Sequence, residues 1–417
     1  MEIYLVIYPE TFLWFNGTHG LFYNCEAHTL LHFSSTEIIL KYCNRINDFY
    51  NMYVITVDEE DRVNPEFNHW LLEIETNKIG EIVKTNGNEK PYSVPPILNL
   101  QHIVEQKRMG DFKFRPYNIA NNFHEITFEL GGECLPDDER DFYKQIPYPA
   151  SDENHIDLTS LLSFLNSTNV RYLQQINIIT KTLSHYSDYN LLIEKLPLLG
   201  IHITFYIDGN DEQGIMRLIE SPFINNISVC LYYSNVVMLN NIEKMLKDKG
   251  IGHEWIFIIK EENDIVNTIH TIREYSIENY RLLPVITGTK LNQKLFEQSV
   301  YTTYKDLTIC NLDKRNIFCN QTINSNFWGH IFVTPKKEVC GNFNGNIRGT
   351  MSDNLLSLLH DEMLDDDTFW KHTRRMVKPC SDCIFSCLCP PPSNYEIFTN
   401  KYDMCMIINE RHFNLTQ

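Results

Sequence analysis

Four cysteines fall within ten residues of the stretch KPCSDCIFSCLCPPPSNYE, and three prolines follow at once. Cys380 and Cys383 form a C-x2-C pair, a spacing that lets two thiolates face one metal ion. Cys389 follows after five further residues and Cys405 after another fifteen. Four thiolates suit a tetrahedral zinc ion or a 4Fe–4S cluster, so these four residues are candidate metal ligands. The alternatives are small buried hydrophobes in a loop-rich fold, or a labile disulfide.

The other cysteines near the C-terminus are weaker candidates. Cys387 alternates with Cys389, so its thiol is expected to point away from a site that Cys389 faces. Cys319 and Cys340 are separated by twenty residues, which include most of a predicted hairpin, HIFVTPKKEVC. They could form half of a second site, to which Cys310 offers a third ligand. Ordinary thiols without a metal are the alternative.

Charge and segment composition limit the class of protein. The net charge of −18 argues against a nucleic-acid partner. The stretch MEIYLVIYPETFLWF has no basic segment, so it predicts a strand rather than a signal peptide. No apolar run reaches the roughly 18 residues that span a bilayer, so no membrane insertion is expected. We therefore expect a cytoplasmic protein with reduced thiols, whose clustered cysteines indicate a metal or catalysis rather than disulfides.

The length of 417 residues predicts two or three domains. Residues 1–95 indicate a small α+β unit, with strands at EIYLVIY, HTLLHF and NMYVITV. The run STEIILKYCNRIND predicts a helix capped by Ser35 or Thr36, and NGNEKPYSVPP predicts a linker. Residues 306–417 hold eight of the twelve cysteines and are predicted to form a separate cysteine-rich module.

Residues 96–305 are predicted to form the middle domain, and from about residue 123 they alternate strand-like and helix-like runs. The predicted strands are HEITFEL, QQINIIT, HITFYID, ISVCLYY, EWIFIIK and LLPVITG. Five helix-like runs lie between them, and NQKLFEQSVYTTY predicts a sixth helix after the last strand. Repeated βα units indicate an α/β fold with a parallel sheet, either doubly wound or a barrel. Six units are too few for an eight-stranded barrel, and periodicity alone does not separate a partial barrel from an open sheet.

The C-x2-C-x5-C run with a distant last cysteine resembles the core of the SPASM domain. This domain is the C-terminal extension of radical-SAM enzymes that modify ribosomal peptides. Cys380, Cys383 and Cys389 match the first three positions of the motif, and Cys405 matches the last. The resemblance implies that these four residues hold the outer auxiliary 4Fe–4S cluster.

A second auxiliary cluster in that family uses a further cysteine, and Ser393 stands at its place here. Cys319 and Cys340 would resemble other ligands of this inner cluster, and the resemblance marks them as less certain metal ligands. Without a cysteine at position 393, the inner cluster lacks one family ligand.

The middle region resembles a radical-SAM barrel, which is a partial barrel of six βα units. Such enzymes carry C-x3-C-x2-C after the first strand, and three thiolates hold the cluster that reduces S-adenosylmethionine. Cys134 is the sole cysteine after HEITFEL, so S-adenosylmethionine is not expected as a cofactor. The chain is similar to the pseudo-radical-SAM proteins of Bacteroidales systems that mature Gly-Gly-leader peptides. The stretches that carry this similarity are YNCEAHTLL, NMYVITV, PPILNLQ, YKQ and CSDCIFSCLCPPPSNYE.

The resemblance implies a catalytically degenerate protein. It would act as an accessory or peptide-binding component in ribosomal-peptide maturation or export, with a precursor peptide and other maturation or export proteins as partners. The first domain also resembles small winged-helix-like modules that bind leader peptides by adding a strand to a sheet edge. A structural cap is the alternative for that domain. For the chain, the alternatives are a redox enzyme that uses the C-terminal cluster for electron transfer, and a zinc-stabilised interaction scaffold.

Overall fold

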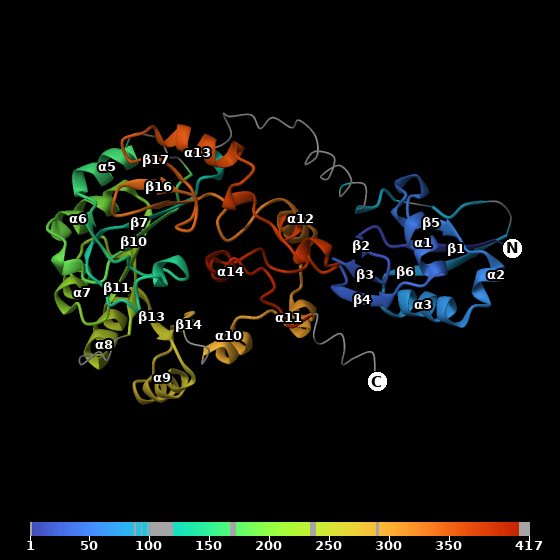
Figure 1. Ribbon diagram of the computed structural model, residues 1–417, viewed down its shortest axis with the longest axis horizontal. Helices are drawn as coiled ribbons and strands as arrows, with labels where there is room; N and C mark the ends of the chain where they lie inside the picture. The colour runs from blue at the N-terminus through green and yellow to red at the C-terminus, as the bar shows by residue number, and fades with distance from the viewer. Residues whose placement is uncertain are drawn as a thin grey trace.

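The computed structural model describes residues 2–86, 89–92, 94–97, 100, 120–166, 172–233, 239–288 and 292–407. The predicted linker, residues 86–96, lies partly outside the described residues. Figure 1 shows three regions in a row, with the N-terminal α+β region at one end and a large helix-covered sheet at the other. Helices α11, α12 and α14 of the cysteine-rich region lie between them.

The N-terminal region contains two small antiparallel sheets. In the first, β1 (Glu2–Ile7) lies between β5 (Val54–Thr56) and β6 (Gly80–Thr85). The second is a meander of β2 (Thr11–Phe15), β3 (His19–Asn24) and β4 (Thr29–Ser34). The predicted strands correspond to β1, β4 and β5. The helices are α1 (Glu37–Asn47), α2 (Glu59–Arg62) and α3 (Pro65–Thr76).

Local sequence explains where these helices begin. The Thr36 side chain accepts a hydrogen bond from the Ile39 backbone N–H, so Thr36 is the predicted N-cap of α1. Helix α3 was not predicted, although Asn64 caps it and Pro65 occupies its first turn. Both helices bury apolar residues at helical spacing against the two small sheets, among them Ile39, Tyr42, Phe67 and Trp70.

The large sheet contains nine strands in the order β14-β13-β12-β11-β10-β7-β15-β16-β17. Its six predicted strands are parallel neighbours: β7 (Glu125–Glu129), β10 (Gln175–Ile179), β11 (His202–Asp208), β12 (Ile227–Tyr232), β13 (Gly252–Ile259) and β14 (Tyr280–Pro284). Strand β15 (His330–Val333) joins parallel to β7, and β16 (Glu338–Cys340) and β17 (Ile347–Thr350) continue antiparallel. The C-terminal region thus supplies three strands to the sheet of the middle region.

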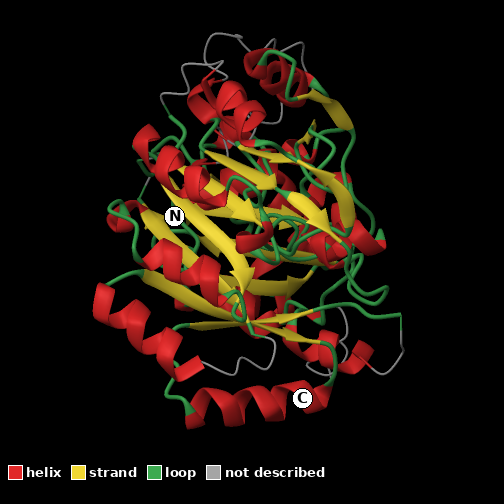
Figure 2. Cartoon of the chain, turned by 90° about the vertical axis from the view of Figure 1, so that its left-hand side faces the viewer, coloured by secondary structure: helices red, strands yellow, loops and turns green. Residues whose placement is uncertain are grey.

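The helices between the parallel strands pack against one face of the sheet, whose side chains form the largest apolar core. They are α5 (Leu158–Asn166), α6 (Tyr189–Lys195), α7 (Glu212–Ile219), α8 (Leu239–Lys249) and α9 (Glu262–Glu274). Figures 1 and 2 show these helices on the outer side of the curved sheet. A doubly wound sheet has helices on both faces, so this arrangement differs from that alternative. The prediction of an α/β fold is confirmed.

The remaining elements connect the sheet to the cysteines. A short antiparallel pair, β8 (Gly131–Glu133) and β9 (Asp152–His155), follows β7. The predicted sixth helix, NQKLFEQSVYTTY, is shorter than expected: α10 (Gln293–Ser299) ends at Ser299, and a separate helix, α11 (Tyr304–Ile309), follows. Helices α12 (Lys314–Thr322), α13 (Leu355–Leu364) and α14 (Asn394–Thr399) complete the region. Among the described helices, none is long and apolar enough to cross a membrane.

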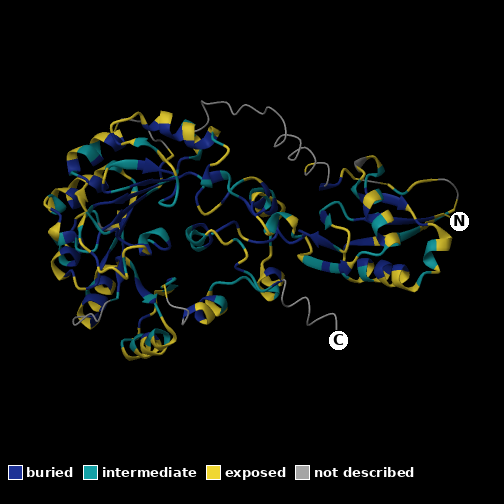
Figure 3. Cartoon of the chain, viewed as in Figure 1, coloured by how far each residue is buried: buried dark blue, intermediate teal, exposed yellow. Residues whose placement is uncertain are grey.

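The β2–β3–β4 sheet has two apolar faces, and each packs into a different core. Phe22 and Phe33 face α1 and α3, whereas Leu21 and Tyr23 face the cysteine-bearing segment. Figure 3 shows this sheet as buried where the N-terminal region meets the cysteine-rich region. Residues 1–95 and the cysteine-rich region therefore share an apolar core.

Two adjacent residues of β3 test this arrangement. Leu21 and Phe22 are both fully buried, and each alanine substitution should cost about 2–5 kcal/mol of stability. We expect Leu21→Ala to raise hydrogen exchange in residues 384–389, because its side chain packs there. Phe22→Ala should raise exchange in α1 and α3 instead. Mass spectrometry of peptic fragments would measure this, and identical exchange patterns for the two variants would contradict a two-faced sheet.

Candidate metal centre

Cys380, Cys383, Cys389 and Cys405 line one buried cavity. The rest of its lining consists of Thr302, Arg374, Pro379, Ser386, Asp403 and Ile407. The cavity is small, with a volume of about 20 Å³, which is room for about one water molecule. The structure therefore brings together the four residues selected from the sequence, in a place that largely excludes water.

Consecutive tight turns place the first three thiols. The 3-10 turn Cys380–Asp382 ends where the Cys383 N–H donates to the Cys380 carbonyl at 3.0 Å. The Cys389 N–H donates to the Phe385 carbonyl at 3.0 Å. Cys405 comes from a later loop that is held against Thr302, whose carbonyl accepts from the Met406 N–H at 2.9 Å. Backbone hydrogen bonds thus position segments that have little regular secondary structure.

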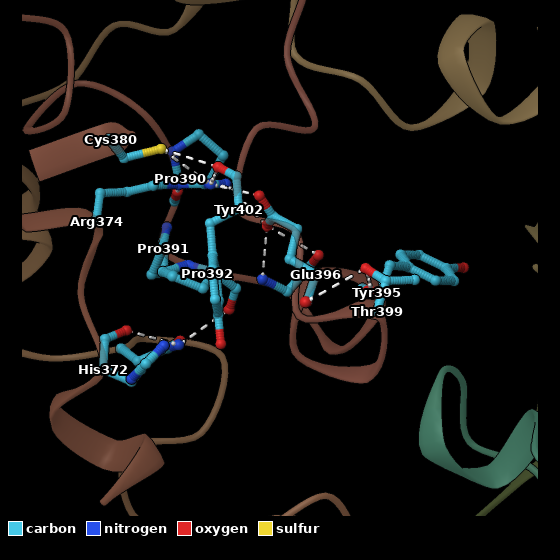
Figure 4. A network of polar contacts seen from close by, with 12 residues as sticks. His372, Arg374, Cys380, Pro390, Pro391, Pro392, Tyr395, Glu396, Thr399 and Tyr402 are labelled. Carbon is cyan, nitrogen blue, oxygen red and sulfur yellow. Dashed lines mark hydrogen bonds and ion pairs between the residues drawn. The ribbon is translucent and has the colours of Figure 1, made fainter. Parts of the chain in front are cut away.

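A buried ion pair borders the cavity (Figure 4). Arg374 is 7% exposed and Glu396 is 2% exposed, and both terminal nitrogens of Arg374 donate to the Glu396 carboxylate. Arg374 also donates to the carbonyls of Pro390 at 2.8 Å and Tyr402 at 3.2 Å, and its Nη1 lies 3.7 Å from Cys380 Sγ. The guanidinium therefore ties together three segments around the thiols and places a positive charge beside them.

Ser393, which stands where the resembled family has a cysteine, begins α14 as its N-cap. The Ser393 N–H donates to Glu396 at 2.9 Å, and its hydroxyl donates at 3.1 Å. This is a capping box, in which the N-cap and the third helical residue satisfy each other's polar groups. The serine thereby holds the carboxylate that pairs with Arg374.

Two of the four thiols, those of Cys380 and Cys389, lie in an environment that favours the protonated form. Burial raises the pKa of Cys389, and it also raises the pKa of Cys380 although the Arg374 guanidinium opposes this. The Cys380 thiol donates to the Tyr402 carbonyl at 2.9 Å. Among the described residues, no three His, Cys, Asp or Glu side chains are arranged to hold a single metal ion. Metal binding would require deprotonation of the thiols and a rearrangement of their side chains.

The other candidate cysteines lie elsewhere. Cys387 is buried and lines a different cavity, between β2 and the cysteine-bearing segment. Cys319 is half-buried on α12, and Cys340 is buried on β16, where burial raises its pKa to about 12. Neither of these two lines the four-cysteine cavity. Cys310 is exposed at the end of α11.

The concave face of the sheet is filled near the strand ends by the segment that follows β7. Phe142, Ile146 and Tyr148 of this segment form an apolar cluster with strand residues, including Tyr232. The Tyr232 hydroxyl donates to the Pro147 carbonyl at 2.6 Å. The Gln145 side chain exchanges hydrogen bonds with the backbone of Ile286, at 2.7 and 3.2 Å. Cys134, at the start of this segment, is exposed.

Sequence reasoning missed Arg374, Glu396 and Thr302. The Ser-x-x-Glu pattern at Ser393 and Glu396 could have indicated a capping box, and hence the start of α14. Arg374 and Thr302 carry no local signal, because their roles depend on segments that are distant along the chain.

Comparisons with known proteins identify structural likenesses only. No protein-family model and no curated protein matches the chain. Streptococcus suis SuiB is similar with 12% identity and a TM-score of 0.46, over 92% of this chain and 94% of SuiB. SuiB bound to its precursor peptide SuiA is 11% identical with a TM-score of 0.45, over 94% of this chain and 98% of that one. The protein anSMEcpe with bound AdoMet and the Kp18Cys peptide is 11% identical with a TM-score of 0.42, over 70% of this chain and 98% of that one. Because these similarities are distant, any statement about the chemistry of this chain must come from its own residues.

The buried ion pair predicts a pattern of stability changes. Arg374→Met should destabilise the protein by about 3–5 kcal/mol, because it leaves the Glu396 carboxylate buried without a partner. The double variant Arg374→Met with Glu396→Leu should recover most of this loss, apart from about 1 kcal/mol for the weakened helix cap. Thermal unfolding of the two variants measures the difference. A double variant that is as unstable as the single one would contradict this explanation.

Proposed function

We propose that this chain is a non-catalytic, peptide-binding component of a ribosomal-peptide maturation or export system, of the pseudo-radical-SAM type. Its middle region would be a partial six-unit barrel, and its C-terminal region would hold a 4Fe–4S cluster. The observation that carries the proposal is the set of four cysteines around one buried cavity, combined with a single exposed cysteine after the first barrel strand.

The donor set of the cavity fits a four-iron cluster. Cys380, Cys383, Cys389 and Cys405 would be its ligands, and each thiolate would bind a different iron atom. The cluster would supply structural cross-links between segments, and electron storage if it is reducible. Arg374 would balance part of the negative charge that four thiolates bring into an apolar site. The same donors also suit zinc, so the metal is decided by measurement.

A radical-SAM reaction is disfavoured by the chain's own side chains. Cys134 alone cannot provide the three thiolates that the family uses to hold its catalytic cluster. Phe142, Ile146 and Tyr148 pack on the concave face close to the carboxyl ends of the strands, where barrel enzymes place their substrates. The segment that bears catalytic cysteines in the family would here act as a filling element.

Strand β4 is the best candidate for peptide binding. It is the outer strand of its sheet. The Ser35 N–H donates to the Thr18 carbonyl at 2.9 Å, so the antiparallel register turns the backbone groups of Leu30, His32 and Ser34 away from β3. A peptide could add a strand at this edge. Another outer strand, β6, is less suitable because Glu75 accepts a hydrogen bond from the outward Ile82 N–H at 3.0 Å.

One observation favours the alternative of a redox enzyme. Cys383 lines the buried cavity and also an open groove between β2 and the cysteine-bearing segment. A cluster bound through Cys383 would thus lie close to a surface that a redox partner could contact. Reversible reduction of the purified protein, with turnover of an electron acceptor, would support this function instead.

Measurement of the metal content after anaerobic purification is the first experiment. We expect about four irons and about four sulfides per chain, and a brown protein. Cys383→Ala should lose most of the iron, because it removes a ligand. Cys387→Ala is the matched control, since it removes a neighbouring buried thiol that lies outside the cavity, and it should keep the iron.

Other metal contents would change the proposal. Iron loss in both variants would indicate disrupted folding rather than loss of a ligand. Zinc without iron would favour the interaction scaffold. Absence of any metal after reconstitution would refute the cluster. About eight irons would indicate that Cys319 and Cys340 also serve as ligands.

A proline at the β4 edge tests peptide binding. Ser34→Pro removes an outward N–H without breaking a bond to β3, so it should weaken binding of a Gly-Gly-leader precursor peptide about tenfold or more. Ser34→Ala keeps the N–H and is the control, for which unchanged affinity is expected. Calorimetric titration measures both variants. Equal affinities for the two variants would exclude strand addition at β4.

A further inference from the structure

A second cavity lies on the concave face of the large sheet, and no cysteine lines it. Its floor includes Glu125 and Thr127 of β7, Asn177 of β10 and His330 of β15. Its volume is about 230 Å³, which is smaller than the roughly 300–1,000 Å³ of pockets that enclose drug-sized ligands. A space of this size suits a group of about one amino-acid side chain.

The floor is a connected polar network. The Asn177 side-chain N–H₂ donates to Glu125 Oε1 at 2.6 Å and to Thr127 Oγ1 at 3.0 Å. His330 Nε2 lies 2.8 Å from the same hydroxyl, and burial lowers the pKa of His330 to about 4, so its ring is neutral at pH 7. Glu125 is therefore the charged group of the floor.

The Glu125 carboxylate has hydrogen-bond acceptor positions left for a ligand. Its side chain is 30% exposed, and His330 Nε2 lies 3.7 Å from its Oε1 atom. Among the described residues, Asn177 is the one side chain that donates a hydrogen bond to it. An ionised carboxylate accepts about four hydrogen bonds, so acceptor positions remain for a group that enters the cavity.

Aromatic rings form much of the wall, namely those of Tyr143, Tyr206, Phe327, Phe332 and Phe343. Phe343 makes edge contacts with Tyr143 and Phe332, with ring centroids 5.7 and 4.8 Å apart. The faces of such rings attract cations. Two rings of the segment that supplies Tyr143 already lie against cations. Lys144 Nζ lies 5.5 Å from the centroid of the Tyr143 ring, and Lys260 Nζ lies 5.3 Å from that of Phe142.

The described lining carries one carboxylate and no lysine or arginine. Lys144 outside it is paired with Asp141 at 3.1 Å. We propose that this cavity binds the cationic end of a lysine or arginine side chain of a peptide, with Glu125 as its counter-ion and the aromatic rings around it. The inference rests on the proposed peptide-binding function for its biological meaning. Its test is separate, because it needs neither the metal nor the β4 edge.

The test uses capped single amino acids on the full-length protein. N-acetyl-lysine amide and N-acetyl-arginine amide are titrated by calorimetry or ligand-observed NMR, and neutral N-acetyl-norleucine amide is the control probe. We expect at least one cationic probe to bind at least tenfold more tightly than the neutral one. The two cationic probes distinguish an ammonium site from a guanidinium site.

Three variants assign the binding to the cavity. Glu125→Gln should weaken binding of the cationic probe at least fivefold, because it removes the counter-ion. Glu254→Gln removes a carboxylate from β13, outside the cavity lining, and should leave binding unchanged. Phe343→Leu keeps apolar volume but removes a ring, and should also weaken binding, which guards against a folding defect in Glu125→Gln. Unfolding temperatures check all three.

The proposal is overturned by any of three results. These are equal binding of the neutral and cationic probes, unchanged binding in both Glu125→Gln and Phe343→Leu, or no binding of either cationic probe at 50-fold molar excess over millimolar protein. Loss of leader-peptide binding in Ser34→Pro with retained binding of the cationic probe would show that the two sites are independent.

Discussion

A parallel sheet is buried on both faces, so both faces must be covered by other parts of the chain. In this protein the helices between the parallel strands cover only the outer face. The concave face is covered instead by the segment after β7, through Phe142, Ile146 and Tyr148. The cysteine-rich region also reaches this side, since the Tyr395 hydroxyl of α14 donates to the Pro284 carbonyl of β14 at 2.8 Å. This requirement accounts for the position of the filling segment and for the contact between α14 and β14.

The cysteine-bearing segment is stabilised by more than its thiols. From one side it packs against the β2–β3–β4 sheet, where Phe385 and Leu388 share a core with Leu21. From the other side the Arg374–Glu396 pair links it to α14. Metal binding can supply much of the folding energy of a loop-rich module that has little core of its own. The structure adds a core that comes from residues about 360 positions earlier in the chain. A metal would therefore reinforce a segment that is already packed, and residues 1–95 serve in part as its support.

The local sequence pattern was sufficient to predict those strands and helices whose apolar residues recur at a regular spacing. The six parallel strands and the helices between them were predicted because each strand is short and apolar and each helix has apolar residues at helical spacing. Strands β2 and β3 and helix α3 were not predicted. Both faces of β3 are buried, so the stretch HGLFYN lacks the alternation that marks a strand with one exposed face. The addition of β15 to the sheet was also unforeseen, because pairing with β7 joins residues about 200 positions apart.

The sequence by itself determined which side chains are available for chemistry, because residue type and spacing select the thiols at 380, 383, 389 and 405 and leave one cysteine in the segment that follows β7. It also determined the α/β alternation, because periodicity is a local property. Only the tertiary structure decided that these four thiols share a cavity while Cys387 faces another, and that Arg374 pairs with the Glu396 carboxylate of the α14 helix cap. Only it placed Glu125 among aromatic rings from four separate segments. These features depend on contacts between distant parts of the chain, whose geometry is set by how the sheet is covered and not by any local pattern.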